Sequence, residues 1–526
     1  MKRIIKASIL AALFASASST AMAVERGGIL HYGRYADSIF LDPVFADSNV
    51  DIWILTNLYD TLLLPTDDGK GVRPGLASAW QLSPDSKTVT LTLRDGLFFS
   101  DGSPITAEDV KWSLDRARKP GNGLWGPDVE SIDTITIADP KTIVLALKHP
   151  DPAILASLTV YNTAVVPEKI LEALPGANDE EKAKVFSRHP VVSGPFMLDS
   201  WSRGTVMKLV ANPHYWQKGS DGKPLPYLDG IDFEIIPDDA TRILKLQAGE
   251  LDGAELIPFP RVAELQADPK LDLKLFPSTR TSYITVSVRP QLSVGSPNPL
   301  SNDKVRQALN FAVDKDALVQ IVTHGIGTPT SSFLSSATAL HVGKGAVFPF
   351  DLAKAKTLLT EAGYPNGFAT SIFVLAGSQD ENTIAAALQQ MWAAIGVKLD
   401  IQQVDNATRV AHYNKGDFSM RVGFWTDDTP DPSEAASYMA YYPHIQSLHT
   451  GWKNDEVDRL FTQSQSEIDP VARAAEYAQI QKIYNATAPL IFLYETPYAV
   501  ALRKPVKGFN QIPLGINIFV GVSLEK

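Results

Sequence analysis

The residues best suited to chemistry are a run of carboxylates that follows a tryptophan. The segment Gly423–Pro432 reads GFWTDDTPDP, so a hydrophobic stretch ends at Trp425, and Asp427 and Asp428 come shortly after it. A partly buried aspartate there would hold an ammonium group through a charge-assisted hydrogen bond, which contributes about 1.5–3 kcal/mol. Trp425 would stack on the same ligand or face its cation. The alternative interpretation is a solvated turn whose aspartates cap a helix.

Two strands are expected to position such a site. Ser419–Trp425 has the pattern of a strand, and ligands of open α/β sheets bind beyond the carboxyl ends of strands. The first expected strand, Ile29–Arg34, ends in the same way at Arg34, Tyr35 and Ser38. The planar fork of an arginine suits a ligand carboxylate, although a surface salt bridge explains Arg34 equally well. We predict that these three residues line a cleft.

Helix and strand patterns alternate along the chain, which favours a mixed α/β architecture. Thr88–Leu93 alternates apolar and polar residues, as a half-buried strand does. Thr106 stands where it can cap a helix, and Asp303, Asp314 and Asp469 are expected to cap three more. The sequence contains no internal repeat and no low-complexity tract.

One glycine-rich run invites a second interpretation. Gly121–Gly126 fits the GxGxxG pattern of dinucleotide sites, which requires a strand before the glycines and a helix after them. Here a helical pattern precedes the run and Pro127 follows it. A surface loop is therefore the better interpretation, and from it Trp125 is able to reach the rim of a cleft.

Motifs for cofactors and metals are weak. No GxxxxGK[ST], GxSxG or HExxH pattern occurs. His444 and His449 would share a face if they were helical, but Pro443 precedes them and favours two loop histidines. We predict no cofactor and no metal site, and we keep His444 as the one metal candidate.

The N-terminus has the features of a cleaved signal peptide over residues 1–23. A positive start, a short apolar core and a small-x-small cleavage site follow one another, in Lys2, Arg3 and Lys6, then Ile9–Phe14, then Ala21–Ala23. Cleavage would leave 526 − 23 = 503 residues. We therefore expect a periplasmic protein.

Composition excludes several classes of protein. The chain has no cysteine, which excludes a disulfide framework, thiol catalysis and a lipoprotein anchor. The net charge is −11, or −14 once the three cationic residues of the signal peptide are subtracted. This acidic balance argues against nucleic acid and against an anionic membrane surface. We expect a freely diffusing monomer whose partners are a small molecule and a transporter rather than nucleic acid.

Several segments together resemble one family. They stand in the same order as in the extracytoplasmic solute-binding proteins of family 5, the dipeptide-, oligopeptide- and nickel-binding receptors of ATP-driven importers. The resemblance spans nearly the whole chain after residue 23. The matching segments are Leu91–Ala117, Val192–Trp201 (VSGPFMLDSW), Asn212–Trp216 (NPHYW), Leu246–Ala254 (LQAGELDGA), Val305–Pro329, Ala353–Phe368 and Ile395–Pro432.

This resemblance implies an α/β, two-lobed periplasmic-binding-protein fold, class II-like and of cluster C. Lobe I would comprise residues 24–275 and 490–526, with an extra subdomain at 71–189, and lobe II would comprise 276–489. The chain would cross between the lobes near Thr281–Val288 and Ile491–Ala501. Two adjacent crossings form a hinge that can close without breaking either core.

The resemblance also implies roles for single residues. Asp428 matches the aspartate that pairs with the α-amino group of peptide ligands, while Asp427 stands where relatives often have a small or neutral residue. Ser193 and Gly194 match a tight turn against the ligand. Nickel-binding relatives use a histidine in the region of His444. Weaker candidates near the predicted hinge are Arg280 and Tyr283.

The leading hypothesis is a periplasmic receptor that captures a small polar solute by lobe closure and delivers it unchanged to an ABC importer permease. The ligand class would be a di- or oligopeptide, or an amino-acid-derived conjugate such as an opine. One alternative is a receptor for nickel or a metal chelate. A further alternative is a secreted hydrolase that pairs Asp428 with Asp431 or Glu434, since glycosidic chemistry needs two carboxyl groups across one bond.

Overall fold

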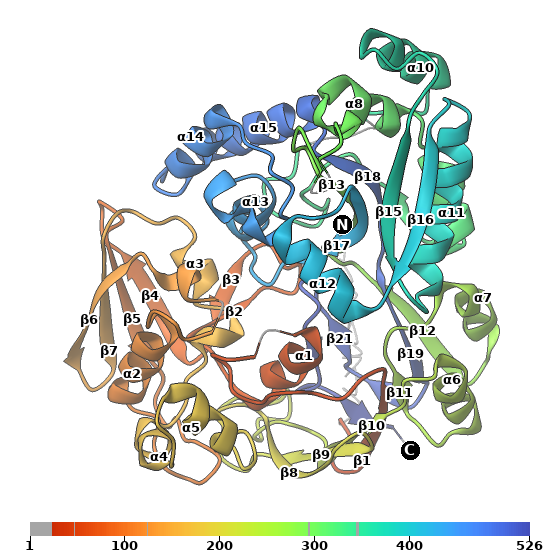
Figure 1. Cartoon of the computed structure of the whole chain (residues 1–526). Coiled ribbons are helices and arrows are strands. Elements are labelled where there is room, and N and C mark those ends of the chain that lie inside the picture. The colour runs from red at the N-terminus through yellow and green to blue at the C-terminus, as the bar shows by residue number, and fades with distance from the viewer. Residues whose placement is uncertain (1–23, 47, 124, 293–294, 343–346, 526) are drawn as a thin grey trace, which may run out of the picture.

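Three sheets organise the chain (Figure 1). The computed structural model describes residues 24–46, 48–123, 125–292, 295–342 and 347–525, and the predicted signal peptide lies outside these ranges. A seven-stranded sheet defines lobe I, a six-stranded sheet defines lobe II, and a four-stranded sheet forms a subdomain beside lobe I. Within the described ranges, none of the helices has both the length and the apolar character that crossing a bilayer requires.

The lobe I sheet is mixed. β1 runs parallel to β10 and β11, and the other neighbouring strands are antiparallel. The predicted strand at residues 29–34 is confirmed as β1, in which Leu30 and Tyr32 are fully buried. The strand order is β12 (Leu271–Phe276), β19 (Tyr498–Arg503), β11 (Gly253–Ala254), β1 (Ile29–Arg34), β10 (Gly230–Ile235), β9 (Val206–Ala211), β8 (Phe196–Ser202).

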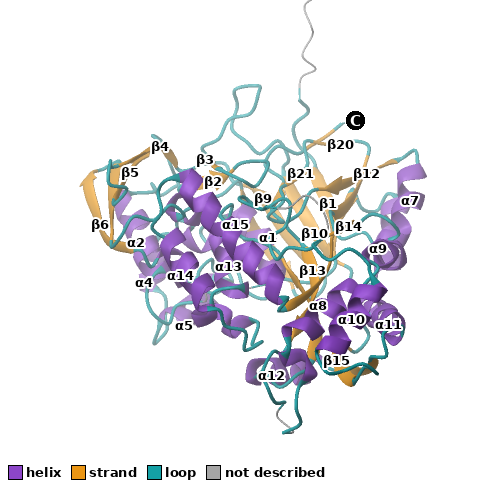
Figure 2. Cartoon of the chain, turned by 90° about the horizontal axis from the view of Figure 1, so that it is seen from above, coloured by secondary structure: helices purple, strands orange, loops and turns teal. Residues whose placement is uncertain are grey.

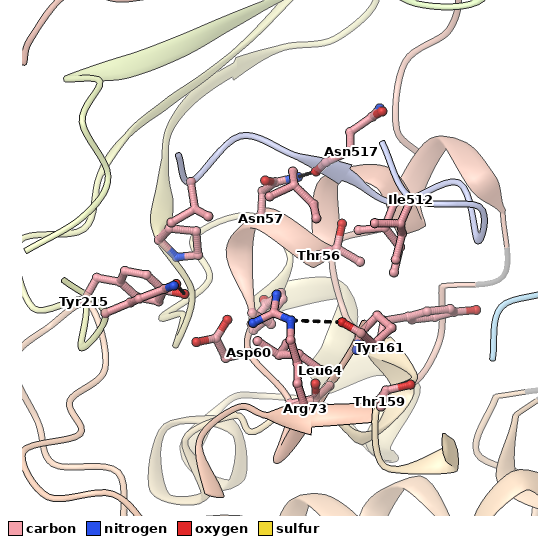
Figure 3. Close-up of a pocket in the computed structure, with 18 residues that line it drawn as sticks. Thr56, Asn57, Asp60, Leu64, Arg73, Thr159, Tyr161, Tyr215, Ile512 and Asn517 are labelled. Carbon is pink, nitrogen blue, oxygen red and sulfur yellow. Dashed lines mark hydrogen bonds between the residues drawn. The ribbon is translucent and has the colours of Figure 1, made fainter. Parts of the chain in front are cut away.

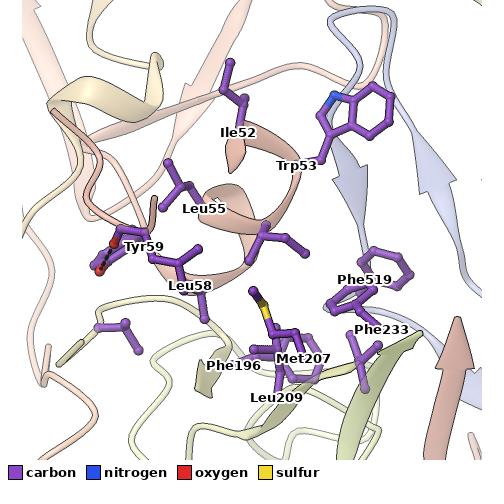
Figure 4. Packing of buried hydrophobic residues seen from close by; sticks show 14 of the residues in the cluster. Ile52, Trp53, Leu55, Leu58, Tyr59, Phe196, Met207, Leu209, Phe233 and Phe519 are labelled. Carbon is purple, nitrogen blue, oxygen red and sulfur yellow. Dashed lines mark hydrogen bonds between the residues drawn. The ribbon is translucent and has the colours of Figure 1, made fainter. Parts of the chain in front are cut away.

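The core of lobe I forms around α1 (Asn49–Leu58), which is buried on nearly all sides (Figure 4). Ile52, Leu55 and Leu58 belong to one apolar cluster with residues of the sheet and the C-terminal segment, namely Phe196, Met207, Leu209, Phe233 and Phe519. Each such side chain contributes about 1.5–3 kcal/mol when it is fully buried. The helix therefore holds the loops at both of its ends in place.

Smaller elements complete lobe I around this core. Two helices, α6 (Asp239–Ala248) and α7 (Phe259–Ala267), pack with β11, β12 and β19 in a separate apolar cluster. Three two-stranded pairs are β2 (Leu63–Pro65) with β3 (Val72–Pro74), β20 (Val506–Lys507) with β23 (Ser523–Leu524), and β21 (Asn510–Gln511) with β22 (Asn517–Ile518).

The subdomain packs one helix on an antiparallel sheet. Its strands are β4 (Ala77–Leu82), β5 (Thr88–Leu93), β7 (Thr142–Leu147) and β6 (Ile132–Asp139). Thr106 caps α2 (Ala107–Ala117) as predicted, because its hydroxyl accepts the N–H of Asp109 while the Asp109 carboxylate accepts the N–H of Thr106. The remaining elements are η1 (Gly126–Val129), α3 (Ile154–Ser157), η2 (Tyr161–Thr163), α4 (Glu168–Ala173) and α5 (Asp179–Phe186).

The lobe II sheet brings β17 to its centre. The strand order is β14 (Thr328–Pro329), β18 (Leu490–Glu495), β13 (Thr281–Val286), β17 (Met420–Trp425), β15 (Ala369–Leu375) and β16 (Lys398–Val404). Helices α13, α14 and α15 form a group on the side of lobe II that faces the subdomain (Figures 1 and 2). The helices are η3 (Pro299–Ser301), α8 (Asp303–Phe311), α9 (Lys315–Thr323), α10 (Leu352–Glu361), α11 (Gln379–Ala393), α12 (Asn406–Lys415), α13 (Ser433–Met439), η4 (Tyr442–Ser447), α14 (Asp455–Ser464) and α15 (Pro470–Thr487).

Two of the three predicted aspartate caps in lobe II are confirmed. Asp314 caps α9 and Asp469 caps α15, each by accepting backbone N–H groups. The prediction for Asp303 was wrong by one residue, because Asn302 supplies the capping oxygen of α8 and Asp303 is the first helical residue. Asp303 instead pairs with Arg306 one turn later.

The chain crosses between the lobes at two adjacent segments. The first crossing follows β12 at residues 277–280, and the second follows β18 at residues 496–497. The backbone N–H of Thr496 donates to the carbonyl of Arg280 across 3.2 Å, so the crossings are joined. The structure differs from the expected boundary at residue 490, because β18 pairs with β13 and therefore belongs to the lobe II sheet.

Candidate functional site

The loop after β17 contains Asp427 and Asp428, the two aspartates predicted from the sequence as ligand-binding residues, and their surroundings differ. Trp425 Nε1 donates to Asp427 Oδ1 across 2.9 Å, and the hydroxyl of Thr338 donates to the other oxygen. The N–H of Asp427 donates to Thr279 Oγ1, and the residue is only 2% exposed. Burial raises the pKa of Asp427 to about 7, against the hydrogen bonds from Thr338 and Trp425. Asp427 is thus fixed by the protein itself.

Asp428 is partly buried, and its carboxylate accepts no hydrogen bond from any described residue. Its backbone N–H donates to Glu434 Oε2 across 2.9 Å, which turns the loop back on α13. Burial, together with the charges of Asp128 and Asp427, raises the pKa of Asp428 to about 7. The side chain is therefore a strong acceptor that the folded chain leaves unused.

Glu434 stands behind Asp428 in the first turn of α13. Its Oε2 accepts the N–H groups of Asp428 and Thr429, whereas its Oε1 is buried and has no partner among the described residues. The residue is 3% exposed. Burial raises the pKa of Glu434 well above its usual range, and three neighbouring carboxylates add to the shift.

The subdomain of lobe I presents Trp125 and Asp128 to this loop. The Trp125 ring lies 6.4 Å from the Tyr438 ring of α13, and Tyr438 lies 5.4 Å from Trp425, so three aromatic rings bridge the lobes. Both Trp125 Nε1 and Asp128 Oδ2 are buried without a partner among the described residues. Burial, together with the charges of Asp151 and Glu130, raises the pKa of Asp128 to about 7.

The glycine-rich loop positions these two residues. Gly123 has φ +61°, and a Cβ at this position would lie 1.9 Å from the carbonyl oxygen of Val44, so only glycine fits. The Trp125 carbonyl accepts a 2.9 Å hydrogen bond from Asn162. The sequence predicted Trp125 at the rim of a cleft but gave no indication of a binding role for Asp128, although Asp128 stands only three residues further on.

The residues predicted at the end of β1 lie inside lobe I. Arg34 is 1% exposed, and its guanidinium donates to Glu255 Oε1 across 3.3 Å and to the carbonyl of Val50 across 3.0 Å. The hydroxyl of Ser38 donates to the same carbonyl across 2.8 Å. Arg34 therefore neither forms a surface salt bridge nor presents a free guanidinium to a ligand, because its N–H groups donate to Glu255 and to the backbone. Tyr35 is partly buried, and its ring lies 6.1 Å from the Trp53 ring.

Ser193 and Gly194 join two segments of lobe I. Ser193 Oγ donates to the Val165 carbonyl and accepts the N–H of Asp60, both across 3.0 Å. A Cβ on Gly194 would lie 2.6 Å from the backbone of Leu58. Their hydrogen bonds and contacts are therefore internal.

The two candidates near the crossings lie on β13 and just before it. Tyr283 is 3% exposed, and its hydroxyl donates to the Phe424 carbonyl across 3.3 Å. The Arg280 guanidinium stacks 4.3 Å from the centre of the Phe424 ring. Both residues therefore brace the strand that carries Trp425.

The residues named for the alternative chemistries are placed differently. Asp431 accepts two hydrogen bonds from the Arg473 guanidinium, across 2.7 and 2.8 Å. Burial would raise the pKa of Asp431, but this ion pair outweighs it and lowers the pKa. His444 is exposed, with its ring 5.2 Å from Tyr441. Within the described ranges, no three side chains of the metal-binding types are grouped to hold an ion.

A separate cavity lies wholly within lobe I (Figure 3). It encloses about 690 Å³, including solvent at its mouth, between α1, the β2–β3 pair and the C-terminal segment. Asp60 lines it and accepts a 2.6 Å hydrogen bond from Trp216 Nε1, and burial raises the pKa of Asp60 to about 6. None of the described residues that line this cavity belongs to lobe II, so closing the lobes would not enclose a molecule bound there.

Comparison with known proteins points to one family. Residues 71–446 match the family described as bacterial extracellular solute-binding proteins, family 5 (middle region). The glutathione-binding protein GsiB of Salmonella typhimurium is 31% identical over 482 residues, which cover 90% of each chain. The probable D,D-dipeptide-binding periplasmic protein DdpA of Escherichia coli is 29% identical over 535 residues, 99% of each chain.

Solved structures agree with this match. The periplasmic binding protein DppA from Helicobacter pylori, in complex with the peptide STSA, is 25% identical and has a TM-score of 0.80, with coverage of 95% of this chain and 99% of that one. AgaA from A. tumefaciens R10, in complex with agropinic acid, is 25% identical with a TM-score of 0.78 and the same coverage. The two-lobed periplasmic-binding-protein fold expected from the sequence is confirmed.

Proposed function

The chain belongs to family 5 of the bacterial extracellular solute-binding proteins, and from that premise we propose that it is the periplasmic receptor of an ABC importer for a small, amine-bearing solute. The solute class is a di- or oligopeptide, or an amino-acid-derived conjugate such as an opine. Glutathione and dipeptide receptors among the relatives, and peptide and agropinic acid complexes among the solved structures, support this class. The receptor delivers its solute unchanged to the permease.

The observation that carries the proposal is the unused carboxylate of Asp428 at the meeting of the two lobes. It lies at the carboxyl end of a central strand, beside aromatic rings that come from both lobes. A solute ammonium would complete its hydrogen bonding, and the rings would pack on the rest of the solute. Because these groups converge only when the lobes meet, the solute binds the closed form better and shifts the population toward it.

Four further properties belong to the same proposal. Residues 1–23 act as a cleaved signal peptide, the mature protein diffuses freely in the periplasm, and it works as a monomer. No covalent bond is made or broken in the site. The ion pair between Asp431 and Arg473 supports this last point, because it occupies one of the two carboxylates considered as the partner of Asp428 in a hydrolase.

The experiment that tests the proposal is native mass spectrometry of protein purified without refolding, followed by calorimetry. The panel contains glutathione, the dipeptide Met-Leu, the peptide Ser-Thr-Ser-Ala and agropinic acid. We expect a co-purified solute of peptide or conjugate mass, or binding of at least one panel member. Protein that carries no solute and binds no member of the panel would refute the proposal, and so would turnover of a bound peptide.

A further inference from the structure

Two carboxylates from opposite lobes lie near each other, and none of the described groups that act on either of them is a cation. Asp128 lies on η1 in the subdomain of lobe I, and Asp428 lies on the loop after β17 in lobe II. The contact between the Trp125 and Tyr438 rings holds these elements together. The charged groups that act on the two carboxylates are acidic: Asp151 and Glu130 act on Asp128, and Asp128 and Asp427 act on Asp428. In this arrangement the closed form brings like charges together.

We propose that Asp128 is a second ligand-binding carboxylate, and that the ligand's primary ammonium group lies between Asp128 and Asp428 and so joins the two lobes. This inference rests on the proposed function and names the chemical group that the solute must carry. Two carboxylates brought together in a partly buried site repel each other, and a cation between them turns that repulsion into two attractions. The same pair therefore keeps the empty receptor open and closes the loaded one.

Two unpartnered groups independently indicate a ligand at this place. Glu434 is 3% exposed, and its Oε1 has no hydrogen-bond partner among the described residues. Trp125 Nε1 is a buried donor that is equally without a partner. Glu434 Oε1, whose protonated form burial favours, lacks a hydrogen-bond partner of either kind among the described residues, and Trp125 Nε1 lacks an acceptor. A primary ammonium with a carbonyl group next to it supplies both, and this combination is the N-terminus of a peptide.

The number of donors separates the solute classes that the proposed function leaves open. A primary ammonium has three N–H donors, whereas a substituted amine has fewer. Asp128, Asp428 and Glu434 together offer several acceptor oxygens around the same loop. The site therefore favours an unsubstituted peptide N-terminus over the N-substituted nitrogen of an opine.

Every titratable group that faces this pair bears on its pH dependence. From lobe I these groups are Asp151, Glu130 and Tyr498, and from lobe II they are Asp427, Glu434 and Tyr438. Burial and neighbouring carboxylates raise the pKa values of both residues to about 7; the neighbours are Asp151 and Glu130 for Asp128, and Asp128 and Asp427 for Asp428. An ammonium ion lowers both again, so binding near pH 7 releases protons.

Calorimetry on Asp128→Asn tests the inference, with Asp133→Asn as a matched control on an exposed position of the same subdomain. The probes are Met-Leu, its N-acetyl form and its N-methyl form. We expect Asp128→Asn to weaken Met-Leu binding about tenfold or more and to leave binding of the N-acetyl form unchanged. Asp133→Asn should behave as wild type. Wild-type protein should bind the N-methyl form more weakly than Met-Leu.

A second measurement needs no ligand. The chain has no cysteine, so spin labels on Asp95→Cys and Asp455→Cys, which are exposed residues of the subdomain and of α14, report the distance between the lobes. We expect empty Asp128→Asn protein to be more closed than wild type at pH 8. An unchanged label distance would overturn the inference. So would Asp128→Asn protein that binds Met-Leu within about twofold of wild type while Asp428→Asn protein loses binding, and that result would leave the proposed function standing.

Discussion

Trp425 Nε1 donates a hydrogen bond to Asp427 Oδ1 across 2.9 Å, and this contact separates the roles of two adjacent aspartates. The protein itself satisfies the hydrogen bonding of Asp427, because the Thr338 hydroxyl donates to its second carboxylate oxygen and Thr279 Oγ1 accepts its backbone N–H. Asp428 is left without a side-chain partner among the described residues. One aspartate thus positions the loop, and the other is available to a solute.

The first prediction compares Asp428→Asn with Asp427→Asn. Asp428→Asn should weaken ligand binding about tenfold or more, because a charge-assisted hydrogen bond is lost. Asp427→Asn should lower the melting temperature instead, because one amide cannot accept hydrogen bonds from both Trp425 and Thr338 as the carboxylate does. Calorimetry and thermal unfolding on both variants check the difference. Equal binding losses with equal stability losses would contradict it.

The effect of Asp428→Asn on stability should depend on pH. The pKa of Asp428 is raised to about 7 in the folded protein, so the folded protein holds this proton more tightly than the unfolded chain does. The contribution of the protonated Asp428 carboxyl to the stability of the wild type is fully present below about pH 4 and is lost as the pH rises through 7. Ligand-free Asp428→Asn protein should therefore melt at a higher temperature than wild type at pH 8 and at the same temperature at pH 4. A higher melting temperature at both values would contradict this reason.

Trp125→Phe should weaken binding with no loss of stability. Phenylalanine keeps a ring beside Tyr438 but removes a donor that has no partner in the described protein. One neutral hydrogen bond corresponds to an affinity change of about two- to tenfold. Trp201→Phe is the matched control, since Trp201 Nε1 donates to Asp37 across 2.9 Å, and its loss should lower stability and leave affinity unchanged. Calorimetry together with thermal unfolding distinguishes the two variants.

Arg473→Gln should destabilise the protein by about 3–5 kcal/mol, because it leaves the buried carboxylate of Asp431 without its counter-ion. Arg459→Gln removes a comparable ion pair, with Glu456, but both partners are about half exposed. It should therefore cost only about 0–1 kcal/mol. Denaturant unfolding measures both values. Similar costs for the two variants would mean that burial of the Arg473 pair has no energetic consequence.

Lys315→Met should gain stability relative to wild type as the pH falls from 10 to 7. Lys315 is buried against the Thr330 carbonyl and Ser331, and burial lowers its pKa to about 7. The folded protein therefore holds this proton less tightly than the unfolded chain, which penalises folding increasingly below about pH 10. Methionine carries no such penalty. The difference in melting temperature between the two proteins should grow over this range, and a constant difference would exclude the titration of Lys315 as its cause.

Local patterns in the sequence determined the elements of this protein. The strand pattern of residues 29–34 predicts β1, and the oxygens of Thr106, Asp314 and Asp469 predict three helix starts, because these signals act within a few residues of one another. Trp425 followed by Asp427 and Asp428 is recognisable as a candidate site for the same reason. The resemblance of ordered segments supplied the two-lobed arrangement.

Which polar groups already have partners depends on contacts between distant parts of the chain. Arg34 and Glu255 are 221 residues apart in the chain, yet their contact closes the arginine fork that the sequence left open. Asp128 and Asp428 are 300 positions apart, and no local sequence pattern around either residue predicts that they lie near each other. Burial and pairing depend on groups brought together by folding rather than on neighbours in the chain. The sequence therefore identifies acidic residues as candidates, and the folded arrangement distinguishes those that stabilise the structure from those that are available to bind a ligand.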